Sequence, residues 1–244
     1  MKIKIRCFIL IEDKWKGEVI VLEKLEHLQI LLKNKEFMKF MVPIAAFYFI
    51  WYIAMSYGTL YQLNYLGLSY TFISLASVLN VILQFIWYPI IGKLVDRYNT
   101  DLLLMACFML YFIDSLIWGF TNLSSKYLMI ILVNVIASMT APFFSLTLFK
   151  KKYDIIPQTE RSLYDGFYTA IIASIIALAP IIGSLLKDYI AVNIKPFWIF
   201  EVPQFQLIFM VTNILLLVLI LFNLKKTIRL YKEAKSQGPV DTDN

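Results

Sequence analysis

The chain has few of the residues on which most enzymes rely for chemistry. It contains one histidine, His27, and two cysteines, Cys7 and Cys107, among 244 residues. A single histidine excludes the paired-histidine zinc motifs. The two cysteines lie far apart and match neither a metal-binding spacing nor a disulfide framework. We therefore expect no metal, no cofactor and no catalytic residue, and we interpret the chain as something other than an enzyme.

Charge is scarce as well. Charged residues make up 16% of the chain and apolar residues 60%, with a mean hydropathy of +0.70, whereas soluble domains are about 25% charged. So few charges cannot cover the surface of a soluble fold of this size. Eight glycines and eight prolines exclude a collagen-like chain, and the apolar content excludes disorder. The composition predicts an all-α, polytopic membrane protein.

The apolar residues come in six blocks, each about long enough to span a bilayer as a helix. Their approximate bounds are 38–61, 69–91, 102–120, 126–149, 165–187 and 203–224. The runs are continuous, whereas barrel strands are about 10 residues long and alternate apolar with polar positions. Six transmembrane helices are therefore expected.

The distribution of basic residues predicts the orientation. With both termini in the cytoplasm, 20 of the 23 Lys and Arg residues fall on the cytoplasmic side, as the positive-inside rule requires. We expect a multi-pass protein of the cell membrane with cytoplasmic termini. The net charge of +6 thus follows from topology, and no nucleic-acid partner is expected.

Three regions follow from this pattern. Residues 1–36 form a charged cytoplasmic segment or linker, 37–228 a six-helix transmembrane domain, and 229–244 a polar cytoplasmic tail. Within the first region, residues 22–32 space apolar side chains among charges. This spacing fits either a helix on the membrane surface or a solvated linker.

Three of the blocks carry polar or aromatic stripes at helical spacing. They are Tyr48, Tyr52 and Ser56 with the adjacent Trp51; Ser77, Asn80, Gln84 and Tyr88; and Asn134, Ser138 and Ser145. Polar groups are costly inside a bilayer. The stripes either bond neighbouring helices together or converge on a water-accessible cavity, which Trp51, Tyr52, Asn80, Gln84, Asn134 and Ser138 would line.

Asp114 is the carboxylate that lies well inside a block, towards the outer end of the third. Two roles are open for it: an ion- or proton-coupling site, or a hydrogen bond to a neighbouring helix.

Two cytoplasmic segments carry sharper patterns. Gly92-Lys93-Leu94-Val95-Asp96-Arg97 follows the second block, and Pro157-Gln158-Thr159-Glu160-Arg161 precedes the fifth. The first resembles the G-x-L-x-D-R-x-G signature of the major facilitator superfamily (MFS), with Asn99 in place of the last glycine. The second is similar to the P-x-x-x-R stretch of that family, and residues 179–184 resemble a weakened G-P-x-x-G-G motif.

The resemblance implies half of an MFS bundle, because the family has two six-helix halves. The fourth block lacks the arginine typical of the N-terminal half, and residues 31–37 resemble the basic linker before the seventh helix. The chain therefore resembles the C-terminal half. The family further implies a conformational loop at Gly92, Asp96 and Arg97, with Arg161 nearby. It also places Asp114 on a peripheral helix.

By this resemblance the chain would move a small solute across the lipid bilayer by alternating access. It would pair with a second six-helix half or form a homodimer. The alternative is a non-transporting membrane subunit or sensor, since a single half lacks the second repeat. No charged residue marks the expected central cavity, which favours neutral or amphipathic solutes.

Overall fold

The computed structural model describes residues 31, 33–197 and 200–236. Its helices are α2 (Lys35–Met55), α3 (Gly58–Leu60), the π-helix η1 (Tyr61–Tyr65), α4 (Tyr70–Arg97), α5 (Thr100–Phe120), α6 (Lys126–Ile155), the 3₁₀-helix η2 (Gln158–Glu160), α7 (Arg161–Asn193) and α8 (Pro203–Ser236). Six segments are long and apolar enough to span a membrane. The prediction of six transmembrane helices is confirmed, whereas the expected surface helix at 22–32 lies almost entirely outside the described residues.

Polar side chains define the helix ends. Asn34, Ser69 and Asn99 accept hydrogen bonds from backbone N–H groups at the starts of α2, α4 and α5, which a helix start otherwise leaves unpaired. Two lysines bind backbone carbonyl groups at the C-terminal ends of helices. Lys126 Nζ donates to the carbonyl of Leu66 at 2.6 Å, and Lys150 Nζ donates to that of Val95 at 2.7 Å. Each lysine also places positive charge at the negative end of a helix.

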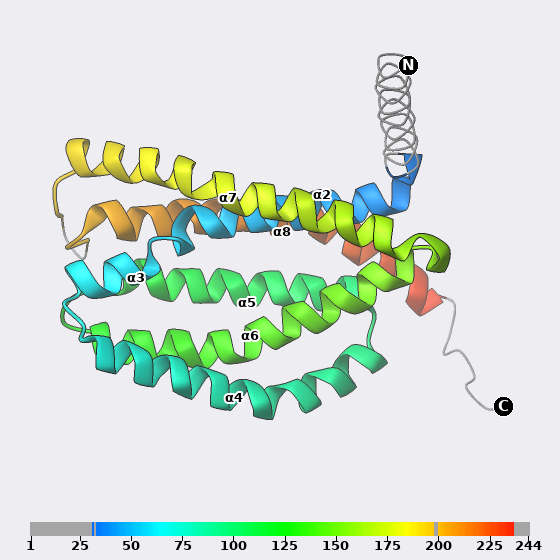
Figure 1. The fold of residues 1–244 in the computed structure, drawn as a ribbon, viewed down its shortest axis with the longest axis horizontal. Helices are drawn as coiled ribbons and strands as arrows, with labels where there is room; N and C mark the ends of the chain where they lie inside the picture. Colours follow the sequence, from blue (N-terminus) through cyan, green and yellow to red (C-terminus); the bar gives the residue numbers. More distant parts are fainter. Residues whose placement is uncertain (1–30, 32, 198–199, 237–244) are drawn as a thin grey trace, which may run out of the picture.

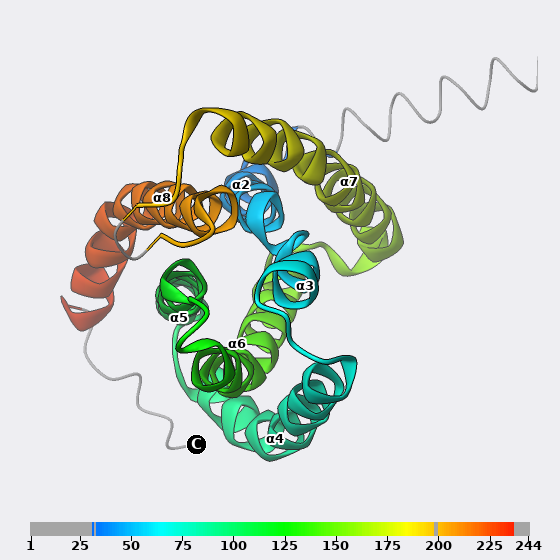
Figure 2. The same ribbon diagram turned by 90° about the vertical axis from the view of Figure 1, so that its left-hand side faces the viewer.

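The helices pack as two interlocked groups of three. α2 packs against α7 and α8, and α6 packs against α4 and α5, while α5 and α8 join the groups. Figures 1 and 2 show α2, α7 and α8 along one side of the bundle and α4, α5 and α6 along the other. Along the chain, the triplet α6, α7 and α8 corresponds to the triplet α2, α4 and α5, because α6 packs on α4 and α5 as α2 packs on α7 and α8. Since α2 and α6 cross in opposite directions, the two triplets form an inverted repeat.

The core has two centres along the bundle. At the first, the ring of Phe47 lies 4.8 Å from that of Phe144 and 5.1 Å from that of Phe108. At the second, Trp118 stacks on Phe209 at 5.2 Å. Aromatic rings fill large volumes with little loss of side-chain freedom. They therefore fix the relative positions of α2, α5, α6 and α8.

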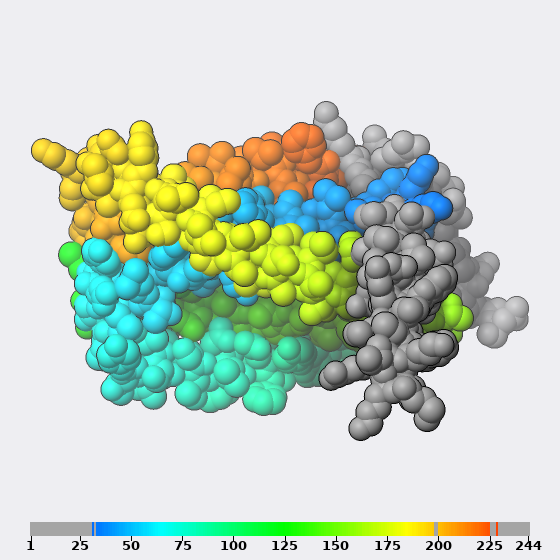
Figure 3. Space-filling model, turned by 45° about the horizontal axis from the view of Figure 1, so that its top comes forward, coloured from blue at the N-terminus to red at the C-terminus, as the bar shows by residue number. Residues whose placement is uncertain are grey.

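The flanking helices α4 and α7 bury little of their surface. Along the whole of α4 only Ala76, Ile91 and Val95 are buried. α7 exposes Gly166, Ala170 and Ser174 on one face. Figure 2 shows α4 and α7 bounding one side of the bundle, and in Figure 3 the surface is recessed between them. On this side, α4 and α7 therefore leave much of their surface uncovered by the described residues.

Gly183 holds α7 close to α2. A Cβ atom built there would collide with the carbonyl oxygen of Ile53 and lie 2.9 Å from the Tyr57 ring, whereas nothing lies within 4 Å of one at Gly166. We expect Gly183→Ala to destabilise the bundle by about 1–3 kcal/mol through overpacking. Gly166→Ala should leave the bundle unchanged or slightly more stable. The unfolding midpoint of each purified variant measures the difference, and equal midpoints would contradict this packing.

Candidate functional site

The predicted polar stripes of α4 and α6 meet. Asn80 Nδ2 donates to the backbone carbonyl of Asn134 at 2.8 Å, and Gln84 Nε2 donates to Asn80 Oδ1 at 2.6 Å. All three side chains are half-buried. The contact between Asn80 and Asn134 is an interhelical hydrogen bond of the kind that joins membrane helices. Gln84 and the side chain of Asn134 make no bond across the interface among the described residues.

The other predicted cavity residues divide into two kinds. Ser138 is fully buried, and its hydroxyl donates to Val135 of its own helix at 2.6 Å. Trp51 and Tyr52 lie half-buried on α2, and the Trp51 ring contacts that of Tyr111 edge-on at 4.5 Å. Ser138 therefore belongs to the packing of α6 in this state, whereas the two aromatic residues keep part of their surface accessible.

Asp114 lies inside the bundle on α5. It is 2% exposed, and its Oδ1 has no hydrogen-bond partner among the described residues. The adjacent Ser115 donates to the carbonyl of Phe209 on α8 at 3.4 Å. A buried carboxyl oxygen without a partner is costly. Asp114 is one of several buried polar side chains with such an atom among the described residues, together with Thr147, Thr212 and Asn213.

The segment predicted to be a conformational loop is helical in the structure. Gly92, Asp96 and Arg97 lie in the last turns of α4, because the helix continues to Arg97, and Arg161 is the first residue of α7. Asp96 is exposed and forms no ion pair with a described residue. The Arg161 guanidinium lies 5.2 Å from the centre of the Tyr153 ring. The structure therefore brings neither Arg97 nor Arg161 to the carboxylate of Asp96.

Asp165 forms the ion pair at the junction of α6 and α7. Its carboxylate lies 2.6 Å from Lys152 Nζ and accepts a 2.6 Å hydrogen bond from the hydroxyl of Tyr153. These contacts tie the end of α6 to the first turn of α7 across the connection at 156–160. In the sequence, the signal for this pair is the run Lys150-Lys151-Lys152, which comes shortly before Asp165. The run is compatible with several pairings between a lysine and a carboxylate.

Among the residues that the structure describes, no group of three or more His, Cys, Asp or Glu side chains could hold a metal ion. The site therefore consists of uncharged polar and aromatic groups between helices, with ion pairs at the bundle end. Such a site can bind and release a solute, and it offers no nucleophile with a base beside it.

The family comparison covers nearly the whole chain. The family model described as Major Facilitator Superfamily matches residues 7–180 and, in an overlapping alignment, residues 44–242. No curated protein sequence matches the chain.

The pair Lys152–Asp165 should couple α6 to α7 energetically. The two side chains are 15% and 31% exposed, so screening by water is incomplete. We expect a coupling energy of about 1 kcal/mol in a double-mutant cycle of Lys152→Gln and Asp165→Asn. Asp96→Asn, which breaks no ion pair of the described residues, is the matched control. A coupling energy of zero, or an equal loss of stability in the control, would contradict the assignment.

Proposed function

Because this chain belongs to the Major Facilitator Superfamily, we propose that it is the C-terminal six-helix half of a transporter that moves a small solute by alternating access. Members of this family are transporters and not enzymes. The observations that carry the proposal are the recessed side between α4 and α7 (Figure 3) and the contact between α4 and α6, where the polar residues Asn80, Gln84 and Asn134 lie half-buried. An MFS half needs such a side to meet a second half.

The second wall of the cavity comes from another six-helix unit, either a separate half or a second copy of this chain. The exposed face of α7 supports this proposal, because Gly166, Ala170 and Ser174 lie on it and small residues let helices approach closely. The solute lies between the units, against Trp51 and Tyr52 of α2, Gln84 of α4 and Asn134 of α6. These side chains carry no charge, so the solute is neutral or amphipathic.

Removal of the amide groups should impair transport without disturbing the bundle. Gln84→Ala and Asn134→Ala each remove a group that offers hydrogen bonds to a solute. Neither breaks the bond between α4 and α6, because Asn80 binds the backbone carbonyl of residue 134. We expect uptake to fall about fivefold to tenfold, equivalent to one lost hydrogen bond. The measurement is uptake of a panel of radiolabelled neutral solutes into proteoliposomes, with and without a co-reconstituted MFS N-terminal half.

Two control results decide how the experiment is interpreted. Asp114→Asn keeps the shape of the side chain, and we expect a smaller loss of uptake because α5 packs away from the recessed side. Complete loss from Asp114→Asn alone would make Asp114 the coupling site. Absence of uptake for every solute, with and without the second half, would favour a non-transporting subunit or sensor.

We further propose that both chain ends face the cytoplasm of a cell membrane. Lys93, near the end of α4, and Lys195, after α7, are both exposed and lie at opposite ends of the bundle. In a chain whose native cysteines are replaced, a cysteine at position 195 should react with an impermeant thiol reagent added to intact cells. A cysteine at position 93 should react only after lysis. The reverse pattern would invert the topology.

A further inference from the structure

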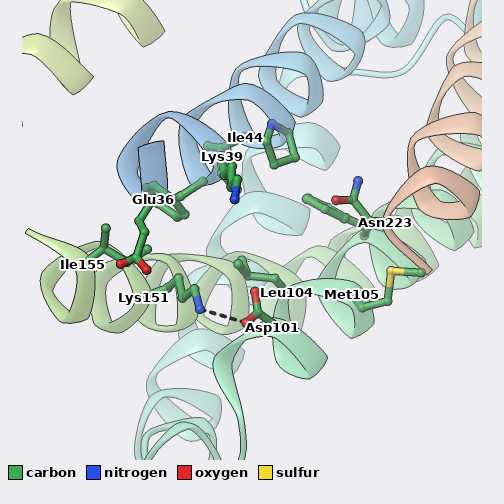
Figure 4. A pocket seen from close by; sticks show the side chains of 12 residues that line it. Glu36, Lys39, Ile44, Asp101, Leu104, Met105, Lys151, Ile155 and Asn223 are labelled. Carbon is green, nitrogen blue, oxygen red and sulfur yellow. Dashed lines mark hydrogen bonds and ion pairs between the residues drawn. The ribbon is translucent and has the colours of Figure 1, made fainter. Parts of the chain in front are cut away.

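A pocket opens at the end of the bundle where α2 begins, away from the proposed solute cavity. Its volume is about 290 Å³, and α2, α5, α6 and α8 all contribute to its wall. Figure 4 shows Lys39 and Glu36 on α2, Asp101 on α5, Lys151 on α6 and Asn223 on α8 around this space. None of the proposed solute-binding residues lines it. The charged residues sit at helix ends, which in a spanning bundle lie at the depth of the lipid headgroups.

The charges of the pocket are only partly paired. Lys151 Nζ lies 2.8 Å from Asp101 Oδ2 and forms an ion pair with it. Among the described residues, Lys39 has no carboxylate within 4 Å and Glu36 has no cation within that distance. In Figure 4 the ammonium group of Lys39 points from α2 into the pocket, and Glu36 lies to one side of it. Within the described part of the chain, the pocket thus presents one positive and one negative group that have no ionic partner.

Apolar surface continues from these charges towards the bilayer. Phe40, Ile44, Leu104 and Phe108 line the inner part of the pocket. A second, more open hollow shares Lys39, Pro43 and Asn223 with it and continues along Met38 and Val42. Val42 is 61% exposed. A ligand that matches the whole surface therefore needs a headgroup with both charges and an apolar chain.

We propose that this pocket binds an aminophospholipid, a lipid with a phosphate and a primary ammonium group, from the leaflet that surrounds the start of α2. Lys39 binds the phosphate, Glu36 binds the ammonium, and one acyl chain lies along Pro43 and Val42. The two lysines and two carboxylates give the pocket no net charge. A zwitterionic headgroup satisfies Lys39 and Glu36 together, whereas an anionic headgroup would leave Glu36 unpaired beside a phosphate.

The experiment titrates the purified chain in detergent with short-chain lipids and counts bound lipid by native mass spectrometry. The probes are dioctanoyl phosphatidylethanolamine, dioctanoyl phosphatidylglycerol, dioctanoyl phosphatidylcholine and glycerophosphoethanolamine, which lacks acyl chains. We expect phosphatidylethanolamine to bind most tightly. Phosphatidylcholine should bind less tightly because its quaternary ammonium donates no hydrogen bond. Glycerophosphoethanolamine should bind weakest because it buries no apolar surface.

Two substitutions separate the roles of the charges. Lys39→Gln should weaken phosphatidylethanolamine binding about tenfold, the loss of one charge-assisted hydrogen bond. Glu36→Gln should weaken phosphatidylethanolamine binding but leave phosphatidylglycerol binding unchanged or tighter, which abolishes the preference between the two. Lys35→Gln is the matched control, because Lys35 is an exposed lysine on the same turn of α2 that does not line the pocket.

Three results would overturn the proposal. In the first, phosphatidylglycerol binds the unaltered chain as tightly as phosphatidylethanolamine, which would indicate an anionic-lipid site. In the second, glycerophosphoethanolamine binds equally well, which would indicate a site for a free phosphate ester. In the third, Lys39→Gln and Lys35→Gln have the same effect. The comparison requires that all variants have the same unfolding midpoint. We expect this because Glu36, Lys39 and Lys35 are exposed.

Discussion

Backbone carbonyl groups within a bilayer have no water to bind, so each must find a partner inside the protein. In this bundle, side chains from other helices reach several of them. The carbonyl of Thr121, at the end of α5, accepts hydrogen bonds from Tyr61 at 2.6 Å and from Gln206 at 2.9 Å. Tyr57 reaches the carbonyl of Pro180, and Lys150 that of Val95. These bonds cross between helices, so satisfying the backbone also fixes the order in which the helices pack.

The same constraint governs where the bundle can bend. Proline lies inside α2, α4, α6 and α7, at Pro43, Pro89, Pro142 and Pro180, and it removes a backbone hydrogen bond at each position. α5 has no proline, and in α8 proline stands only at the first position. The proline-containing helices are equivalent in pairs under the inverted repeat. The helices α5 and α8, which have no internal proline, join the group α4, α5 and α6 to the group α2, α7 and α8, and the helices with an internal proline line or flank the recessed side.

Hydropathy was sufficient to predict the six spans, because continuous apolar runs have few alternatives in a membrane. Helical spacing also put Asn80 and Asn134 on stripes that meet, since Asn80 binds the backbone carbonyl of Asn134, while the cavity that the stripes would line stays a prediction. It could not show that Ser138 turns back to its own helix, since a serine hydroxyl can bond locally or across an interface. The segment at Gly92 is helical and not a loop, because α4 continues beyond its apolar run to Arg97, while its conformational role stays a prediction. The pairing of Asp165 with Lys152 depends on how the connection at 156–160 turns the chain from α6 into α7, which the sequence pattern does not specify.

The lipid pocket had no signal in the sequence, because its walls come from four helices and its shape from the spacing between them. Figure 2 shows the last part of α8 turning away from α5, and Asn223 of α8 lines the pocket near that end. The pocket includes residues of α5 and α8, the pair that joins the group α4, α5 and α6 to the group α2, α7 and α8. A lipid held there would contact the joint between these two groups, while a solute on the recessed side would contact the helices that contain proline. The two ligands would therefore stabilise different parts of one bundle, and binding at each can be measured without the other.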